Sequence, residues 1–177
     1  MRGINMKTMI ISDIHGYSKN LKKVLDVFYK EGCKRLIILG DLLTPGSDYE
    51  EVKNILNNFK FSLLCMKGNN DGYIFNELDF NVIDGYLNIK LDNNNVYITH
   101  GNKYNRNNLD LKSGDILISG HTHISCMYKE NNKYYLNPGS ISLPRDNTDG
   151  SYIIYEDNKF YLYDIDNNLL NCLIIDK

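Results

Sequence analysis

The sequence predicts an α/β fold in which two mixed β-sheets pack face to face and are flanked by helices. Up to Met66, short apolar runs alternate with amphipathic helical segments, which indicates parallel strands joined by helical crossovers. Beyond that point the chain is a succession of short apolar runs separated by Asn-rich turns, which is typical of strands and hairpins. A strand-rich half that follows an α/β half indicates a second sheet packed on the first.

Three strands and two helices are predicted in the first half. The strands are the apolar runs 7–12, 35–39 and 62–66. The first helix begins at Ser18 as N-cap and ends at Gly32, with Leu21, Val24, Leu25 and Phe28 at helical spacing. The second helix spans 48–59 and has acidic residues in its first turn, where they stabilise the helix dipole.

The second half is predicted to contain strands only, at 88–91, 96–99, 116–119, 125–129, 133–136, 151–155 and 159–165. Turns rich in Asn and Asp join three pairs of them into hairpins. Because no repeat, linker or low-complexity tail interrupts the chain, residues 1–177 are expected to form one domain. Met6 is an alternative start, which would make residues 1–5 an N-terminal extension.

The composition is that of an ordinary soluble globular protein, with 42% hydrophobic and 24% charged residues. The formal net charge of −2 gives no basic surface for nucleic acid. Four widely spaced cysteines, none in a C-x-x-C pair, are expected to be reduced thiols. With no run of about 20 apolar residues and no signal-peptide core, the expected location is the cytoplasm.

Histidine is scarce in this chain and its positions are informative, whereas asparagine is not. The chain has four histidines but about 25 asparagines, so a single asparagine has a high chance of being incidental. All four histidines come directly after predicted strands. Ligands of open α/β sheets bind at the carboxyl ends of strands, so these positions are candidates for a site.

Five short motifs follow predicted strands. They are Asp13-Ile-His15, Gly40-Asp41, Gly68-Asn69-Asn70-Asp71, His100-Gly101 and Gly120-His121-Thr122-His123. The Asp13/His15 and His121/His123 pairs are spaced i, i+2, so in extended backbone both side chains of a pair face the same way. The adjacent glycines allow sharp turns and close approach of the backbone.

Each motif alone has an ordinary explanation as a turn, a helix cap or a hydrogen-bonded core histidine. Five such motifs at five strand ends favour metal binding instead. A mixture of carboxylate, imidazole and amide ligands suits Mn, Fe, Zn, Ni or Co better than Ca or Mg alone. Seven candidate ligands exceed the needs of one ion and indicate two ions that share a carboxylate. Two ions roughly 3.5–4 Å apart are the arrangement used for in-line phosphoryl displacement.

The ordered set of five motifs resembles the calcineurin-like metallophosphoesterase superfamily. The short length and the segment Asn137-Pro-Gly-Ser140 resemble its small prokaryotic phosphodiesterase branch. The match runs from about Met6 to the C-terminus, and it implies an α-β-β-α sandwich with two divalent metal ions, for which Mn²⁺ is the first expectation.

The resemblance also implies a role for each ligand. Asp13, His15, Asp41 and His123 would bind the first metal; Asp41 would bridge to the second, which Asn69, His100 and His121 complete. A hydroxide between the ions, positioned by Asp41, would attack phosphorus. Asn70 departs from the family pattern, because many members have a histidine there that protonates the leaving group. Members of the small branch often lack it too.

Several further residues are candidates around the centre. Asp71 is expected behind the ligands rather than on the metal. Asn137 either belongs to a plain turn or supports the site, and the two alternatives stand about even. Arg145 could grip a phosphate with its fork of donors. Tyr134 and Tyr135 could stack a nucleobase, although packing is the ordinary role of tyrosine in a chain that has 14 of them.

The function predicted is hydrolysis of a small phosphate ester, most simply a phosphodiester. The alternative from another class is a protein-interaction scaffold, because a retromer subunit resembles the same fold and is regarded chiefly as a binding module. The seven intact ligands favour the enzyme. A nuclease would need a basic or aromatic groove beside the metals, which the balanced charge does not favour. A homo-oligomer is compatible with the sequence.

Overall fold

The computed structural model describes residues 6–43, 48–72 and 77–176 of the chain. Within these residues the first half runs β1 (Thr8–Ile11), α1 (Ser18–Lys30), β2 (Arg35–Ile38), α2 (Tyr49–Asn57), β3 (Ser62–Met66) and β4 (Val82–Ile83). The second half runs β5 (Tyr86–Leu91), β6 (Asn94–Thr99), β7 (Ile116–Ile118), β8 (Ser125–Glu130), β9 (Lys133–Pro138), β10 (Ser151–Glu156), β11 (Lys159–Asp164) and β12 (Leu169–Ile174).

The first sheet contains seven strands in the order β12-β11-β10-β1-β2-β3-β4. Its centre is parallel, because β1 pairs with β2, β2 with β3 and β3 with β4 in the same direction. The C-terminal strands continue the sheet as an antiparallel meander, in which β10 pairs with β1. The predicted parallel sheet with helical connections is therefore confirmed, and the chain's C-terminal strands complete it.

The second sheet contains five strands in the order β5-β6-β7-β9-β8. The β5–β6 and β8–β9 hairpins form its two edges, and β7 lies between them, parallel to β6 and to β9. Both sheets are thus mixed, and the predicted fold class is confirmed.

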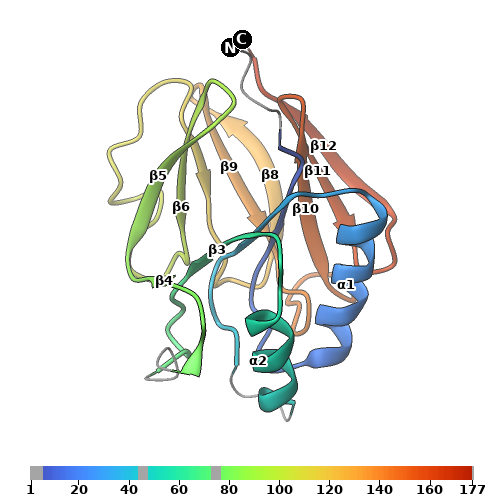
Figure 1. Ribbon diagram of the computed structural model, residues 1–177. Coiled ribbons are helices and arrows are strands. Elements are labelled where there is room, and N and C mark those ends of the chain that lie inside the picture. The colour runs from blue at the N-terminus through green and yellow to red at the C-terminus, as the bar shows by residue number, and fades with distance from the viewer. Residues whose placement is uncertain (1–5, 44–47, 73–76, 177) are drawn as a thin grey trace.

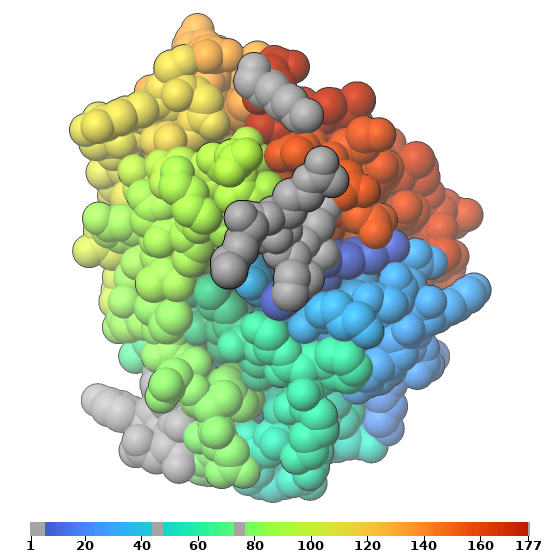
Figure 2. All heavy atoms as spheres, turned by 45° about the horizontal axis from the view of Figure 1, so that its top comes forward, coloured from blue at the N-terminus to red at the C-terminus, as the bar shows by residue number. Residues whose placement is uncertain are grey.

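Strand alternation places one core on each face of the first sheet. Met9 and Ile11 of β1 pack with the apolar side chains of α1, whereas Ile10 between them packs with residues of the second sheet. Figure 1 shows both helices on the same side of the molecule, against the first sheet. Seen with the top of Figure 1 turned forward, the yellow-green second sheet and the orange-red C-terminal strands form opposite flanks (Figure 2).

Among the described residues, no helix covers the outer face of the second sheet. The prediction that helices flank the sheets therefore applies to one side of the sandwich. Its other side is a bare sheet face crossed by the 101–115 segment, whose residues 105–107 border a hollow there.

Some local predictions need correction. Ser18 is the first residue of α1, and Tyr17 precedes it as N-cap without a side-chain cap. Ser18 instead donates its backbone N–H and hydroxyl to the Asp48 carboxylate, at 3.3 Å and 2.9 Å. The sequence signal was misread because the cap of α1 comes from a residue 30 positions away. Gly32 does follow the helix end with φ +69°, as predicted.

Two strands, β4 and β12, were not predicted, and the possible extension at residues 1–5 lies outside the described residues. The four cysteines are free: Cys33 and Cys65 are buried, Cys126 is half-buried and Cys172 is exposed. In the described ranges, no helix combines the length and the apolar character needed to cross a membrane.

We expect Asp48→Ala to lower the free energy of unfolding by about 0.5–2 kcal/mol, because the first turn of α1 loses its acceptor. Asp26→Ala is the matched control, since Asp26 is exposed on α1 and its removal is expected to change stability by less than about 0.5 kcal/mol. Urea unfolding curves measure both. Equal midpoints for the two variants would show that Asp48 does not cap α1.

Candidate metal centre

The five motifs meet where the two sheets bring their strand ends together. Asp13 and His15 follow β1, Asp41 follows β2 and residues 68–71 follow β3, all in the first sheet. His100 follows β6 and residues 120–123 follow β7, in the second sheet. The parallel direction of these strands within each sheet puts their carboxyl ends at one edge, which is the position where α/β sheets bind ligands.

Four of the seven proposed ligands form one compact group. Asp13, His15, Asp41 and His123 each offer a ligand atom, and these atoms all lie within 4.8 Å of one another. The Nε2 atoms of His15 and His123 are 3.2 Å apart, and His123 Nε2 lies 3.3 Å from Asp13 Oδ1. Two ligand bonds of about 2.1 Å at tetrahedral or octahedral angles hold their donor atoms about 3.0–3.4 Å apart. The spacing therefore fits a single ion.

The other three proposed ligands lie on the far side of Asp41. His100 Nε2 is 3.6 Å from Asp41 Oδ2 and 3.0 Å from Asn69 Oδ1. The rings of His100 and His121 are 5.1 Å apart between centroids. Asp41 Oδ2 also lies 3.7 Å from His15 Nε2, so this oxygen stands between the two groups of ligands.

Two of the histidines are held with Nε2 available for a metal. His123 Nδ1 donates to the carbonyl of Leu143 at 2.6 Å, and His100 Nδ1 donates to the carbonyl of Leu39 at 2.8 Å. Since a carbonyl can only accept, Nδ1 carries the proton and Nε2 of the neutral ring has a free lone pair. This backbone support of the second ring nitrogen is the usual way in which proteins orient metal-binding histidines.

A buried carboxylate oxygen lacks a partner at the centre of the first group. Asp13 is fully buried; its Oδ2 accepts the backbone N–H of His121 at 3.1 Å, whereas Oδ1 has no hydrogen-bond partner among the described residues. Burial acts to raise the pKa of Asp13, but the neighbouring His123, Ser12 and His100 together outweigh it and hold this pKa below its usual range. An ionised, unpartnered oxygen facing imidazole lone pairs fits a cation.

The pKa values of His121 and His123 shift in opposite directions. The Asp13 carboxylate raises the pKa of His123. Burial lowers the pKa of His121, and the nearby His100 lowers it further. A neutral His121 is the form that can bind a metal.

Five of the seven proposed ligands have left-handed backbone conformations. Their φ angles are +54° for Asp13, +52° for His15, +52° for Asp41, +69° for His121 and +62° for His123. The i, i+2 pairs therefore converge through turned backbone and not through the extended backbone that the spacing suggested. Non-glycine residues adopt this region at a cost of order 1–3 kcal/mol each, and such residues cluster at functional sites.

Glycines permit the close packing of these turns. A Cβ on Gly68 would lie 2.1 Å from Asp41 Oδ1, and a Cβ on Gly120 would lie 2.0 Å from the Ser12 hydroxyl oxygen. Any side chain at Gly68 would therefore displace the Asp41 carboxylate.

Asp71 supports the loops and does not face the ligands. Its carboxylate accepts the backbone N–H groups of Asp41, Leu42 and Gly68 at 2.7–2.9 Å. Burial raises the pKa of Asp71, and these N–H groups oppose that rise.

Asn70 contacts Asp41 directly: its backbone N–H donates to Oδ1 at 2.8 Å and its side-chain amide to Oδ2 at 2.7 Å.

The Asn137–Ser140 segment holds the opposite wall. Asn137 Nδ2 donates to the Gly120 carbonyl at 2.9 Å and to the Thr122 hydroxyl at 3.1 Å. Ser140 was not singled out from the sequence. Its buried hydroxyl donates to the Asp13 carbonyl at 2.7 Å and accepts the N–H of Leu143 at 2.8 Å, so it joins the Asp13 loop to the segment whose Leu143 carbonyl holds His123. The sequence feature that could have pointed to Ser140 was its position in the Asn137-Pro-Gly-Ser140 motif.

Arg145 lies at the mouth of the centre. Its backbone N–H donates to the His123 carbonyl at 2.9 Å, and its exposed side chain lines an open cleft. The residues that share this cleft are Asp41, Asn69, Asn70, His121, Thr122 and His123. All the predicted ligands thus come together at one edge of the sandwich, with Arg145 beside them.

Comparisons with known proteins agree with this geometry. The chain is similar to the phosphodiesterase YfcE of Escherichia coli (strain K12), with 31% identity over 157 residues that cover 83% of this chain and 85% of the relative. The solved structure of that phosphoesterase superposes with a TM-score of 0.91 and 28% identity, covering 97% of this chain and 100% of the other.

Two further proteins are similar to the chain at lower identity. Phosphodiesterase MJ0936 of Methanocaldococcus jannaschii is 28% identical over 143 residues, covering 76% of this chain and 83% of that protein. Vps29 of Cryptosporidium parvum shares the fold at a TM-score of 0.69 and 20% identity, covering 96% of this chain and 98% of the other. The model of the calcineurin-like phosphoesterase superfamily domain matches residues 6–159. Because that model covers more than half of its length, the chain belongs to the calcineurin-like phosphoesterase superfamily.

Proposed function

We propose that this chain is a phosphodiesterase that works with two divalent metal ions. The observation that carries the proposal is the buried group of Asp13, His15, Asp41 and His123, whose ligand atoms lie within 4.8 Å of one another. The activity named for the E. coli and M. jannaschii relatives supports the same reaction.

The four residues of that group hold the first ion, and Asp41 is the carboxylate shared with the second. Support for the sharing is the position of Asp41 Oδ2, at 3.7 Å from His15 Nε2 and 3.6 Å from His100 Nε2. Asn69, His100 and His121 complete the second site. Asn69 now has a geometric argument beside the motif, because its Oδ1 faces His100 Nε2 at 3.0 Å.

Mn²⁺ is the ion we propose first, with Fe, Zn, Ni and Co as alternatives. Four imidazole and two carboxylate ligands, with one amide, suit these transition metals, and the choice among them depends on availability as well as affinity. When bound, two such ions polarise a phosphoryl oxygen and lower the pKa of water towards neutrality.

The chain's own groups hold the substrate and keep the centre in shape. The guanidinium of Arg145, with its fork of donors, binds a phosphate oxygen at the mouth of the cleft. Asn70 holds the Asp41 carboxylate through two hydrogen bonds. Because an amide has no titratable proton, Asn70 gives no general-acid help to the leaving group. The enzyme is therefore expected to prefer substrates with good leaving groups, and to hydrolyse diesters in preference to alkyl monoesters.

A protein-interaction scaffold is the second candidate. The likeness to Vps29 proteins supports it, but at 20–22% identity this likeness concerns the fold alone. A scaffold does not need buried, strained ligand residues, so the enzyme is the better-supported proposal. The net charge of −2 also favours a small phosphate ester over nucleic acid as substrate.

We expect the purified chain to hydrolyse an activated aryl phosphodiester when Mn²⁺ is added, and a chelator to stop the reaction. Asp41→Asn removes the shared carboxylate and should lower kcat/KM by about 10³-fold or more, since the metals supply several kcal/mol of charge stabilisation. Asp26→Asn, on the exposed side of α1, is the control. Metal content by mass spectrometry should fall in Asp41→Asn only; full activity of that variant, or in chelator, would overturn the mechanism.

Gly68→Ala should abolish most of the activity although it adds one methyl group, because that methyl group would collide with Asp41 Oδ1. Gly32→Ala is the matched control: its Cβ would meet nothing within 4 Å, so it costs only about 1–2 kcal/mol of backbone strain at φ +69°. Kinetics and thermal melting of both variants separate the two effects. Equal loss of activity in both would refute the geometric explanation.

Arg145→Ala should lower kcat/KM for the aryl phosphodiester by about 10–100-fold, as expected for one charged hydrogen bond of roughly 1.5–3 kcal/mol. Metal content should not change, because Arg145 is not a ligand. Arg35→Ala, at the start of β2, is the control. If Arg145→Ala keeps wild-type kinetics, Arg145 does not bind the phosphate.

A further inference from the structure

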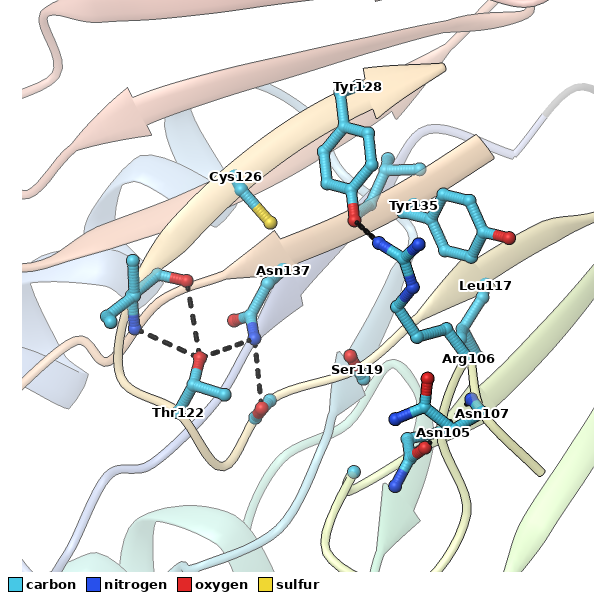
Figure 3. A pocket seen from close by; sticks show the side chains of 14 residues that line it. Asn105, Arg106, Asn107, Leu117, Ser119, Thr122, Cys126, Tyr128, Tyr135 and Asn137 are labelled. Atoms are coloured by element: carbon cyan, nitrogen blue, oxygen red, sulfur yellow. Dashed lines mark hydrogen bonds between the residues drawn. The ribbon is translucent and has the colours of Figure 1, made fainter. Parts of the chain in front are cut away.

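We propose that a hollow on the bare outer face of the second sheet is a binding site for a nucleobase, or an equally flat and uncharged heteroaromatic ring. The hollow has a volume of about 420 Å³, which is within the range of small-molecule sites. It is separate from the metal cleft, since of their lining residues only Thr122 belongs to both. The site is shown in Figure 3.

Strand alternation builds the floor of this hollow from three neighbouring strands. Each strand turns two residues outward, at i and i+2: Leu117 and Ser119 from β7 and its end, Tyr135 and Asn137 from β9, and Cys126 and Tyr128 from β8. The register pairs Leu117 with Tyr135, Tyr135 with Tyr128, and Asn137 with Cys126. One row of the floor is therefore apolar and aromatic, and the other row is small and polar.

The aromatic end of the hollow is formed by two stacked tyrosine rings and an arginine. The rings of Tyr128 and Tyr135 stack with centroids 5.3 Å apart at 28°. The guanidinium of Arg106 lies 4.9 Å from the Tyr135 ring centre and donates to the Tyr128 hydroxyl at 2.7 Å (Figure 3). Arg106 also pairs with Glu130 at 2.5 Å, which neutralises its charge. Flat π surfaces of this kind stack planar rings.

The polar end offers hydrogen bonds that the chain does not use. Among the described residues, the Ser119 hydroxyl and the Asn107 side-chain amide have no hydrogen-bond partner. Figure 3 shows Ser119 next to Asn105 and Asn107, on the side of the hollow that faces the loop. A hydroxyl and an amide each donate and accept, and this mixed character matches the edge of a nucleobase.

Charge argues against a phosphate as the occupant. Among the described residues that line the hollow, Arg106 has the only ionised side chain, and it is already paired. Burial raises the pKa of the Cys126 thiol, so the floor beside it is neutral at physiological pH. An uncharged ring with a polar edge is therefore favoured over the phosphate esters of the metal cleft.

The two adjacent tyrosines that the sequence offered for base stacking have different roles. Tyr134 is buried in the core between the sheets, and its hydroxyl lies 3.1 Å from the Asp176 carboxylate. Tyr135, one residue later, points to the outer face and lines the hollow. Packing explains Tyr134, and only Tyr135 is placed to meet a ligand.

The test is titration of the purified chain with adenosine, guanosine, cytidine and uridine, followed by ligand-observed NMR and calorimetry. These probes carry no phosphate, so an affinity for them does not depend on hydrolysis. We expect at least one to bind with a Kd below about 1 mM. Absence of binding by all four up to their solubility would overturn the proposal, whereas failure of the proposed hydrolysis would leave these titrations unchanged.

Variants locate the bound nucleoside. Cys126→Phe fills the floor and should weaken binding at least tenfold, whereas Cys172→Phe, on the exposed strand β12, should leave it unchanged. Circular dichroism checks the fold of both. If Cys126→Phe does not fold, Arg106→Ala removes the outer wall from an exposed position and should also weaken binding. Binding that survives these changes and is lost in Arg145→Ala would place the nucleoside in the metal cleft and refute the proposal.

Discussion

Asp13 and Asp41 are buried carboxylates that have no lysine or arginine partner among the described residues. Their exposed fractions are 0% and 1%, and the basic groups within 4 Å of them are histidines. Burying a carboxylate is costly in free energy. The histidines and Ser12 beside Asp13 offset this cost enough to hold its pKa below the usual range. The acceptor atoms that five separate loops bring together here fit a divalent cation, which would offset the remaining cost.

The backbone around these acceptors is arranged to keep them from moving apart. Left-handed turns at Asp13, Asp41 and His121 store strain that an isolated loop would release. Hydrogen bonds to the loops oppose that release: the buried carboxylate of Asp71 binds three backbone N–H groups, and the hydroxyl of Ser140 joins the Asp13 and Leu143 segments. The hydrogen bonds to Asp71 and Ser140 thus keep the strained turns in place. This arrangement holds the candidate ligand atoms of Asp13, His15, Asp41 and His123 within 4.8 Å of one another, and a donor group fixed in this way is the preorganisation that catalysis by charge stabilisation needs.

The sequence could single out the candidate ligands because their residue types are scarce or chemically distinctive, and because strand ends are easy to locate. It could not predict how they converge. The spacing of His121 and His123 suggested extended backbone, but a positive φ at each depends on contacts with Ser12, Asp13 and the 137–140 segment, which are distant in the chain. The prediction of the α1 cap was wrong for the same reason, because the acceptor is Asp48, which lies just before α2. Strand β12 has mostly exposed side chains and lacks the alternation that reveals a half-buried strand.

The segment from Ser119 to His123 also shows why two sites can lie back to back in so small a domain. His121 and His123 face the metal cleft, and Thr122 between them turns its hydroxyl the other way, to Asn137 on the outer face. Asn137 itself lines the outer hollow, so one hydrogen bond separates the floor of that hollow from the metal ligands. A bare sheet face is what makes this possible, because a helix packed there would fill the hollow. Because no helix of the described residues covers the second sheet there, the back of the 119–123 loop stays open to the small ligand that we propose.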